Sequence, residues 1–367
     1  MSPAGGNSFP IALLGRRDQP TDALRDYCHW LAGALNRRGI QMEITEVPWE
    51  SQGFPAALVQ LWRRCKDWQG RWVLVQYTAL GWSRRGFPLG FLWVLRVLQR
   101  NGAHCVVVFH DALPYGGTRR IDQMRRACQL WVMRRAYQWA ERSVLTIPLD
   151  HVGWLPPQPT KVAFIPIGAN LPPVAMNDVG TRVTPATKTV AVFGITGEPA
   201  TLSEVRDIGY ALKRAKGKLG ELRLVALGRG SSEAEPALRR ELDGSGVEAL
   251  VLGLLPPDEI AKTLAHADVL LFVRGGVSSR RGSALAGIAC GLPIVGYKGP
   301  ETGFPITEAG LELVANGDRD ALAAALDHVL GDDRLRQDLR RRSLSAHADY
   351  FSWEKIAERF AAELSYG

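Results

Sequence analysis

The chain has 367 residues, of which 46% are hydrophobic and 22% charged, so it has the balance of a soluble globular protein with room for two domains of about 170 residues. No segment reaches the ~20 uncharged apolar residues that a membrane span needs, and no basic leader precedes the first apolar run. The five cysteines form no Cys-x-x-Cys pair, which argues against disulfides and a structural zinc site. These features favour a cytoplasmic protein.

The net charge of +8 is unevenly placed along the chain. From Met1 to Asn170 there are 21 Lys and Arg against 11 Asp and Glu, and this half also holds every tryptophan except Trp353. A basic, aromatic surface suits an anionic acceptor or an anionic lipid headgroup. No nucleic-acid-binding motif accompanies it, so nucleic acid is not the expected partner.

The first half alternates between apolar runs of strand length and stretches with helical spacing. Strands are expected at Phe9–Gly15, Gln41–Val47, Trp72–Gln76, Cys105–Phe109, Ser143–Ile147 and Val162–Ile165. Helices are expected at Ala23–Arg38, Pro55–Lys66, Pro88–Gln99 and Thr118–Arg142. This alternation predicts a parallel sheet covered on both faces.

The long helical stretch Thr118–Arg142 mixes basic and aromatic residues, which invites a membrane-surface interpretation. Its two arginine pairs, Arg125-Arg126 and Arg134-Arg135, are nine positions apart and therefore point to opposite sides of a helix. Because the pairs make no single basic face, a packed helix with solvated arginines is the favoured interpretation, with membrane contact as the alternative.

Residues 171–187 are rich in Pro, Thr, Asn and Gly and predict a linker. Strands then follow at Val190–Phe193, Leu222–Leu227, Leu250–Leu252, Val269–Val273 and Ile294–Val295, with helices at Leu202–Lys216, Glu235–Leu242, Asp258–His266 and Gly282–Ala289. The predicted domains are 1–170 (basic, acceptor side) and 188–350 (donor side), with a C-terminal helix in 351–367 that packs back on the first domain.

The stretch from Val269 to Gly296 predicts a strand, a Gly-Gly turn and a helix of small residues, with Ser278 or Ser279 as its N-cap. Such a helix N-terminus binds anions. Arg280 and Arg281 lie in the first turn, where the helix dipole disfavours cations, so a phosphate would explain them. Solvated surface arginines are the alternative.

Five motifs in the second half then identify a resemblance. LVALGRG, VLGLLPPDEIAKTLAHADVLLFV, ACGLPIVG, GLELVANGDRDALAAALDHVL and YFSWEKIAERF resemble, in order and spacing, family 4 retaining glycosyltransferases from about Val190 to Phe360. In the first half, VFHD and IPIGAN match more weakly. The resemblance implies an α/β fold of GT-B type, in which two tandem Rossmann-like domains have parallel sheets facing an interdomain cleft.

The chain departs from that family at the donor site. The family's two glutamates, eight positions apart, fall on Ser278 and Ala286, and its Arg and Lys phosphate clamp is absent from the loop GITGEP. A repair is available within the chain. Arg280 and Arg281, with the backbone amides of Gly276 to Ser279, would hold the diphosphate, and Glu301 would serve the donor hydroxyls.

The resemblance also suggests roles for residues at other strand ends. His110 matches the family histidine near the donor sugar, and Asp111 beside it would contact the acceptor or orient its loop. Gly15 and the loop with Asp18 and Thr21 match the loop that approaches phosphate and acceptor. Thr196 and Gly197 would offer amides to the diphosphate. Structural explanations remain for several of these: a satisfied histidine for His110, a turn for Gly15 and a tight turn for Thr196 and Gly197.

Together these features predict a glycosyltransferase that moves a sugar, with retention, from a nucleoside-diphosphate sugar to a glycan, lipid-linked or small-molecule acceptor, without a metal ion or other cofactor. Peripheral membrane contact through the basic first domain is a further option, and the oligomeric state is left open. One alternative is a non-catalytic homologue that binds a sugar nucleotide or a partner protein. Another is a nucleotide-sugar epimerase or hydrolase of the same fold.

Overall fold

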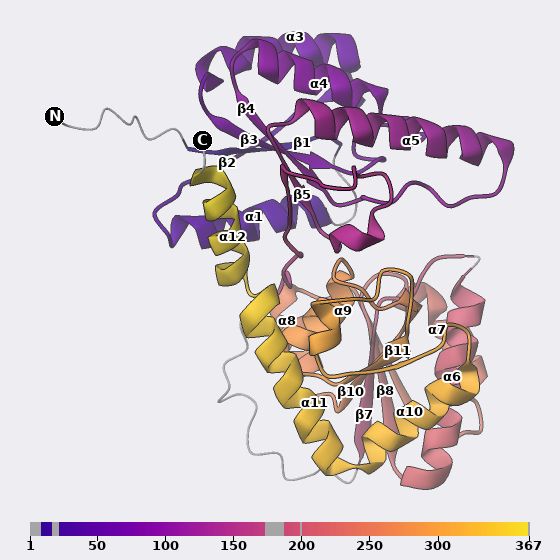
Figure 1. The fold of residues 1–367 in the computed structure, drawn as a ribbon. Helices are drawn as coiled ribbons and strands as arrows, with labels where there is room; N and C mark the ends of the chain where they lie inside the picture. Colours follow the sequence, from indigo (N-terminus) through magenta and orange to yellow (C-terminus); the bar gives the residue numbers. More distant parts are fainter. Residues whose placement is uncertain (1–8, 17–21, 173–186, 199, 366–367) are drawn as a thin grey trace. The chain divides into compact units, whose positions relative to one another are not determined.

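The computed structural model describes residues 9–16, 22–172, 187–198 and 200–365. The chain divides into two compact units: unit 1 is Met1–Ile167 with Trp353–Gly367, and unit 2 is Gly168–Ser352 (Figure 1). Each unit contains a six-stranded sheet in which all paired strands are parallel. Of the predicted linker, residues 173–186 lie outside the described residues.

The sheet of unit 1 has the strand order β2-β1-β3-β4-β5-β6. Its strands are β1 Ile11–Leu14, β2 Glu43–Glu46, β3 Trp72–Tyr77, β4 His104–Phe109, β5 Arg142–Leu145 and β6 Val162–Phe164. Its helices are α1 Ala23–Asn36, α2 Trp49–Gln52, α3 Phe54–Arg64, α4 Leu89–Arg100, α5 Arg120–Trp139 and α12 Trp353–Ser365, with short 3-10 turns at Cys65–Trp68 and Leu149–His151. None of the helices in the described residues is long and apolar enough to cross a membrane.

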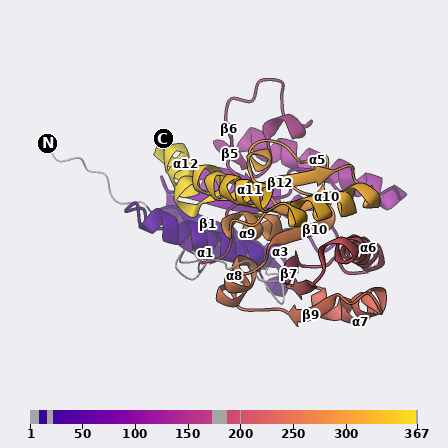
Figure 2. The same ribbon diagram turned by 90° about the horizontal axis from the view of Figure 1, so that it is seen from below.

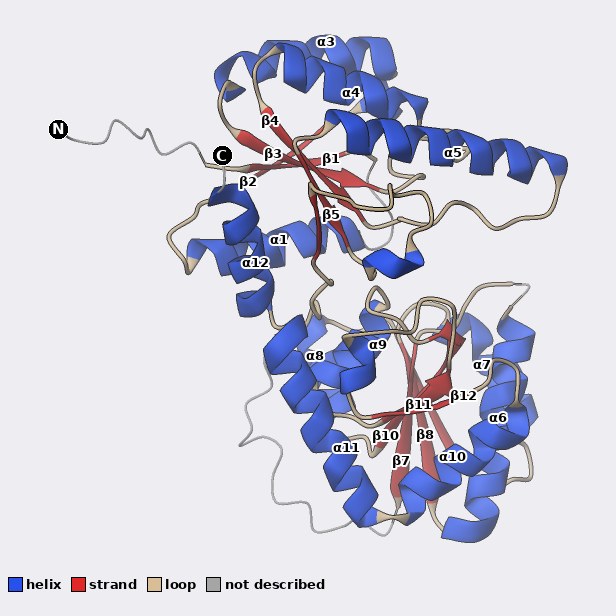
Figure 3. Cartoon of the chain, viewed as in Figure 1, coloured by secondary structure: helices blue, strands red, loops and turns tan. Residues whose placement is uncertain are grey.

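Helices cover both faces of this sheet, as the near-continuous apolar strands predict. α3, α4 and α5 pack on one face, and α1 and α12 pack on the other (Figure 3). α12 comes from the end of the chain, and its Trp353 and Phe360 are buried against Leu31 and Leu35 of α1. The C-terminal helix is therefore part of the core of unit 1.

The sheet of unit 2 has the order β12-β11-β10-β7-β8-β9. Its strands are β7 Lys188–Phe193, β8 Leu222–Leu227, β9 Glu248–Gly253, β10 Val269–Gly276, β11 Ile294–Tyr297 and β12 Leu311–Val314. Its helices are α6 Thr201–Leu219, α7 Ser231–Leu242, α8 Pro257–Ala265, α9 Gly282–Ala289, α10 Arg319–Gly331 and α11 Asp333–Ala346, with a 3-10 turn at Ile306–Glu308 and a π turn at His347–Phe351. α6, α7 and α10 cover one face of the sheet, with α6 and α7 side by side (Figure 2).

Several predicted boundaries in unit 2 differ from those of the structure, the largest differences being at the end of α6, the end of β10 and the start of α7. β10 continues through Gly275 to Gly276, because the pairing with β11 resumes after a shift in register. α7 begins at Ser231, where the prediction placed its start at Glu235. A start at Glu235 would put Pro236 in the first turn, which is where helices usually hold proline, whereas here Pro236 lies inside the helix.

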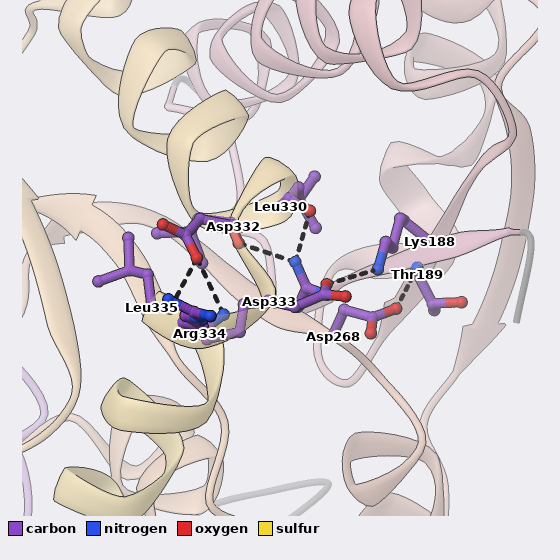
Figure 4. Close-up of polar contacts among 10 residues, drawn as sticks. Lys188, Thr189, Asp268, Leu330, Asp332, Asp333, Arg334 and Leu335 are labelled. Atoms are coloured by element: carbon purple, nitrogen blue, oxygen red, sulfur yellow. Dashed lines mark hydrogen bonds and ion pairs between the residues drawn. The ribbon is translucent and has the colours of Figure 1, made fainter. Parts of the chain in front are cut away.

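The junction between α10 and α11 is tied to the start of β7 (Figure 4). Asp332 caps α11 by accepting hydrogen bonds from the amides of Arg334 and Leu335, at 2.9 and 3.0 Å. The next residue, Asp333, accepts from Lys188 Nζ at 3.3 Å. The contact of Asp333 with Lys188 attaches this junction to the end of the sheet at which its strands begin.

The N-cap of α10 provides a stability prediction. Asp318 accepts a hydrogen bond from the amide of Ala321 at 2.9 Å. Asp318→Ala is expected to lower the free energy of unfolding of unit 2 by about 1 kcal/mol, because this amide would lose its partner. Scanning calorimetry of the full chain measures the change. Asp318→Asn is the control, since it keeps an acceptor, and an equal loss in both variants would contradict the capping role.

Candidate functional site

The strand order of unit 2 places a topological switch point between β7 and β10. The chain runs outward from β7 through β8 to β9 and then returns to β10 on the other side of β7. Loops that leave neighbouring strands at such a point diverge, and ligands bind in the crevice between them. The loop after β7 holds Thr196 and Gly197, and the loop after β10 holds the residues from Ser278 to Arg281. The structure therefore brings the two predicted donor-site segments to one place.

The N-terminus of α9 lies in this place without a side-chain cap. The prediction that Ser278 or Ser279 caps the helix is wrong, because Arg281 occupies the N-cap position. Both serines are buried, with 1% and 0% exposure. Ser278 Oγ donates to Glu301 Oε2 at 3.2 Å, whereas Ser279 Oγ is buried and has no hydrogen-bond partner among the described residues. The first amides of α9 thus receive no hydrogen-bond acceptor from the side chain of the N-cap residue.

Arg280 and Glu301 form a bidentate ion pair across this loop. Arg280 Nε donates to Glu301 Oε2 at 2.6 Å, and Arg280 Nη2 donates to Oε1 at 2.7 Å. Burial alone would raise the pKa of Glu301, but the hydrogen bond and charge of Arg280, helped by the charge of Arg281, outweigh it and lower the pKa. Two residues predicted to contact different parts of a donor therefore contact each other in this structure.

Arg281 differs from Arg280 in the contacts of its guanidinium. Its Nε is buried and has no hydrogen-bond partner among the described residues. Burial, followed by repulsion from Arg280 and Arg274, lowers its pKa, although Glu301 and Glu204 oppose this. A cation held in this way is stabilised by an incoming anion.

The sequence analysis missed three charged residues at this site: Arg274, Glu204 and Arg229. Arg274 lies in β10, and its pKa is lowered by burial and by Arg229, against the opposing charge of the carboxylate of Glu204. Its guanidinium fills the space beside Gly194, where a Cβ would come within 2.6 Å of it. Glu204, buried in the first turn of α6, accepts the amide hydrogen of Thr196 at 2.8 Å. The available signals were the arginines of VRGG and LGRG at two strand ends.

A close backbone approach fixes the loop after β10. A Cβ on Gly276 would lie 2.3 Å from Gly299 Cα, and a Cβ on Gly299 would lie 2.7 Å from Gly276 Cα. Thr302 adds a hydrogen bond from its Oγ1 to the carbonyl oxygen of Val277 at 2.5 Å. Gly276 is therefore required for the loops after β10 and β11 to touch, which holds Glu301 next to Arg280.

In unit 1, His110 follows β4 and is held by a defined network. Its Nε2 lies 2.8 Å from Gln76 Oε1, and the Gln76 amide nitrogen donates to the carbonyl of Leu74, so the oxygen faces the histidine. Nε2 therefore carries the hydrogen, and Nδ1 is the acceptor. Burial lowers the pKa of His110 to about 3, and the ring packs edge-on against Tyr27 at 4.8 Å. His110 is thus a neutral imidazole at physiological pH.

Two other predicted residues of unit 1 have visible structural tasks. Asp111 Oδ2 accepts from the amide of Ala79 at 3.3 Å, so it orients the loop after β3. A Cβ on Gly15 would lie 2.3 Å from the carbonyl oxygen of Gly81, so the loops after β1 and β3 approach each other closely there. Asp18 and Thr21 lie outside the described residues.

The described residues contain no cluster of three or more His, Cys, Asp or Glu side chains arranged to hold a metal ion. The five cysteines are free thiols. Burial raises the pKa of all five, to about 12 for Cys65, Cys105 and Cys290.

Comparison with known proteins agrees with this geometry. Residues 195–332, which include the switch-point loops of unit 2, match the family model of group 1 glycosyl transferases. The sequence matches no curated protein.

Several solved structures share the fold over nearly the whole chain. Anabaena HepE in complex with UDP and glucose is 14% identical with a TM-score of 0.67, covering 97% of this chain and 99% of that one. Sucrose-phosphate synthase from Thermosynechococcus elongatus is 18% identical with a TM-score of 0.68, covering 96% and 98%. WaaG, a glycosyltransferase involved in lipopolysaccharide biosynthesis, is 14% identical with a TM-score of 0.65, covering 98% and 100%. The predicted fold, two Rossmann-like domains of GT-B type, is confirmed.

Proposed function

We propose that the chain is a glycosyltransferase that takes a sugar from a nucleoside-diphosphate sugar, bound at the switch point of unit 2, and transfers it to a glycan, lipid-linked or small-molecule acceptor with retention of configuration. The observation that carries this proposal is the excess of positive charge beside the uncapped N-terminus of α9. Arg274 and Arg281 both have lowered pKa values there, and Arg281 Nε has no hydrogen-bond partner among the described residues. A diphosphate matches such a site in charge and in hydrogen-bond acceptors.

In this mechanism the chain stabilises the charge that develops on the departing diphosphate. Arg281 and the first amides of α9 face the phosphates, and these fixed donors need no reorganisation during the reaction. Glu301, next to this site, is proposed to bind the donor hydroxyls once the nucleotide draws Arg280 away from it. The neutral His110 is proposed to accept a hydrogen bond from the transferred sugar at Nδ1. No metal ion is required in this proposal, because the arginines supply the positive charge.

A thermal-shift panel tests the binding step. Nucleoside diphosphates, UDP among them, are expected to raise the melting temperature of the chain. At a ligand concentration a hundredfold above Kd, binding adds about 2.7 kcal/mol to the free energy of unfolding. The free nucleosides are expected to have little effect, because the site recognises the phosphates, and a chelator is expected to leave the shift in place. Equal shifts with nucleoside and diphosphate would contradict a diphosphate site, and the absence of any shift would contradict nucleotide binding.

One observation favours a second candidate, a nucleotide-binding homologue without transferase activity. Glu301 is the only carboxylate proposed for the donor hydroxyls, and in this structure it is fully engaged by Arg280 and Ser278. An assay with a panel of UDP-sugars, with and without glycan acceptors, separates the two. Transfer of sugar to an acceptor, with NMR showing the anomer formed, supports the transferase. Binding of UDP without transfer or hydrolysis supports the second candidate, and epimer formation with donor alone would indicate an epimerase.

A further inference from the structure

Three helices of unit 1 form one layer on the sheet. α3, α4 and α5 bury one side of each helix in the same core cluster, and α4 contacts both α3 and α5 (Figure 1). Their other sides are exposed. We call these exposed sides together the basic–aromatic face, and its composition differs from that of an ordinary solvated surface.

α4 shows the pattern most clearly. Leu89 and Trp93 are 50% and 63% exposed, and Arg96 and Arg100 are exposed beside them. At about 100° per residue these four side chains fall within an arc of about 60°. They make a stripe along the outer side of the helix, with the two apolar residues first and the two arginines after them, opposite the buried Phe91.

α5 carries a matching stripe. Arg120, Met124, Trp131 and Arg134 recur at spacings of four, seven and three, which places them on one side of the helix. Met124 is 63% exposed and Trp131 48%. The two arginine pairs of this helix do not show the stripe, because Arg125 is half-buried and pairs with Asp122 at 2.7 Å. Once Arg125 is set aside, α5 does have a basic and apolar face.

The charge of the basic–aromatic face has a single sign. α3 adds Val59 and Trp62, which are 53% and 40% exposed. Across the three helices, all of whose residues the structure describes, the exposed charged side chains are arginines alone: Arg63, Arg64, Arg96, Arg100, Arg120, Arg126, Arg134 and Arg135. Their one carboxylate, Asp122, is buried. Such a face repels a second copy of itself and attracts an anionic partner.

We propose that the basic–aromatic face docks unit 1 on an anionic lipid bilayer. Exposed tryptophans lie at the level of the headgroups, and arginines bind the lipid phosphates, so the mixture of both on adjacent helices matches the chemistry of the bilayer interface. An acidic protein is the other partner that this composition fits, since protein interfaces are enriched in the same residues, and a chain that does not bind anionic vesicles would point to it. This proposal concerns a surface of unit 1 and does not depend on the nucleotide site of unit 2.

Vesicle co-sedimentation of the full chain tests the proposal. Binding is expected to vesicles of phosphatidylcholine mixed with phosphatidylglycerol and not to phosphatidylcholine alone, and it is expected to weaken as salt is raised. Arg100→Ser with Arg134→Ser is expected to lower the partition coefficient about 25-fold, since each arginine at an anionic surface contributes about fivefold. Trp93→Ala with Trp131→Ala is expected to lower binding to the mixed vesicles and to leave the salt dependence of that binding unchanged.

The matched control removes the same charge elsewhere. Arg239→Ser with Arg240→Ser, on the exposed side of α7 in unit 2, is expected to leave vesicle binding unchanged. Melting temperatures of all variants show that each is folded, and a UDP thermal shift measured beside them reports on unit 2 separately. No binding to mixed vesicles at low salt, or equal losses in the α7 control, would overturn the proposal. If the chain does not bind vesicles but forms a dimer, and the tryptophan variant dissociates that dimer, the face would be assigned to contact with a second copy instead.

Discussion

Replacing Arg281 by methionine is expected to weaken UDP binding by about 30- to 150-fold without lowering the melting temperature of the chain. The loss of affinity corresponds to about 2 to 3 kcal/mol, the contribution of a charge-assisted hydrogen bond to phosphate. Stability should hold because burial and the neighbouring Arg280 lower the pKa of Arg281, so the folded state disfavours its charge. Methionine keeps the aliphatic volume of the side chain.

The adjacent residue provides the control for this prediction. Arg280→Met removes the same charge from the same turn, but it leaves the carboxylate of Glu301, whose side chain is 12% exposed, without its bidentate partner. This variant is therefore expected to lower the melting temperature and to weaken UDP binding less than Arg281→Met. Isothermal titration with UDP, paired with thermal melts, measures both effects. The assignment of phosphate binding to Arg281 would be wrong if Arg280→Met weakened UDP binding more than Arg281→Met did.

Local signals in the sequence were sufficient to predict the scaffold of this site. The β-branched run before Gly275, the small residues from Gly282 to Ala289, and Pro293 after them mark a strand, a helix and its end. These signals depend only on residues that are neighbours in the sequence, so tertiary contacts do not alter them. The alternation of such units along the chain then predicted two parallel sheets, which the structure has.

The pairing of side chains at the site was not predictable in the same way. Arg280 and Glu301 are 21 positions apart, and they meet because Gly276 and Gly299 allow the loops after β10 and β11 to touch. Arg274 and Glu204 lie on different elements and become neighbours only through the strand order, in which β10 returns beside β7. Ser278 has the residue type of a helix cap, but burial beside a carboxylate gives it another partner. Tertiary contacts overrode local preference there.

The pair of Arg280 with Glu301 has a second consequence, which concerns ligand binding. Glu301→Gln keeps the shape of the side chain and removes its negative charge. UDP is expected to bind more tightly to this variant, because Arg280 and Arg281 lose an opposing carboxylate. Sugar transfer is expected to fall, because the donor hydroxyls lose their proposed acceptor. Tighter binding together with slower transfer would separate the phosphate site from the sugar site, and weaker UDP binding would contradict the arrangement.

The same variant makes a prediction about pH. The folded protein lowers the pKa of Glu301, so the ionised carboxylate stabilises the fold above the ordinary glutamate pKa of about 4.3, and this contribution is lost as the pH falls through the lowered pKa. At pH 7, Glu301→Gln is expected to reduce the free energy of unfolding by about 1 to 3 kcal/mol, less than for a fully buried pair because the side chain of Arg280 is 31% exposed.

Calorimetry of the wild type and of Glu301→Gln between pH 3 and pH 8 measures this loss of stability, and the two stability curves are expected to converge in acid. Glu308→Gln is the control, since it removes an exposed carboxylate seven positions further along the chain and should give a curve close to that of the wild type. Parallel curves for the wild type and Glu301→Gln at every pH would show that the ion pair does not hold the loop, because the difference between them would then not depend on the charge of Glu301.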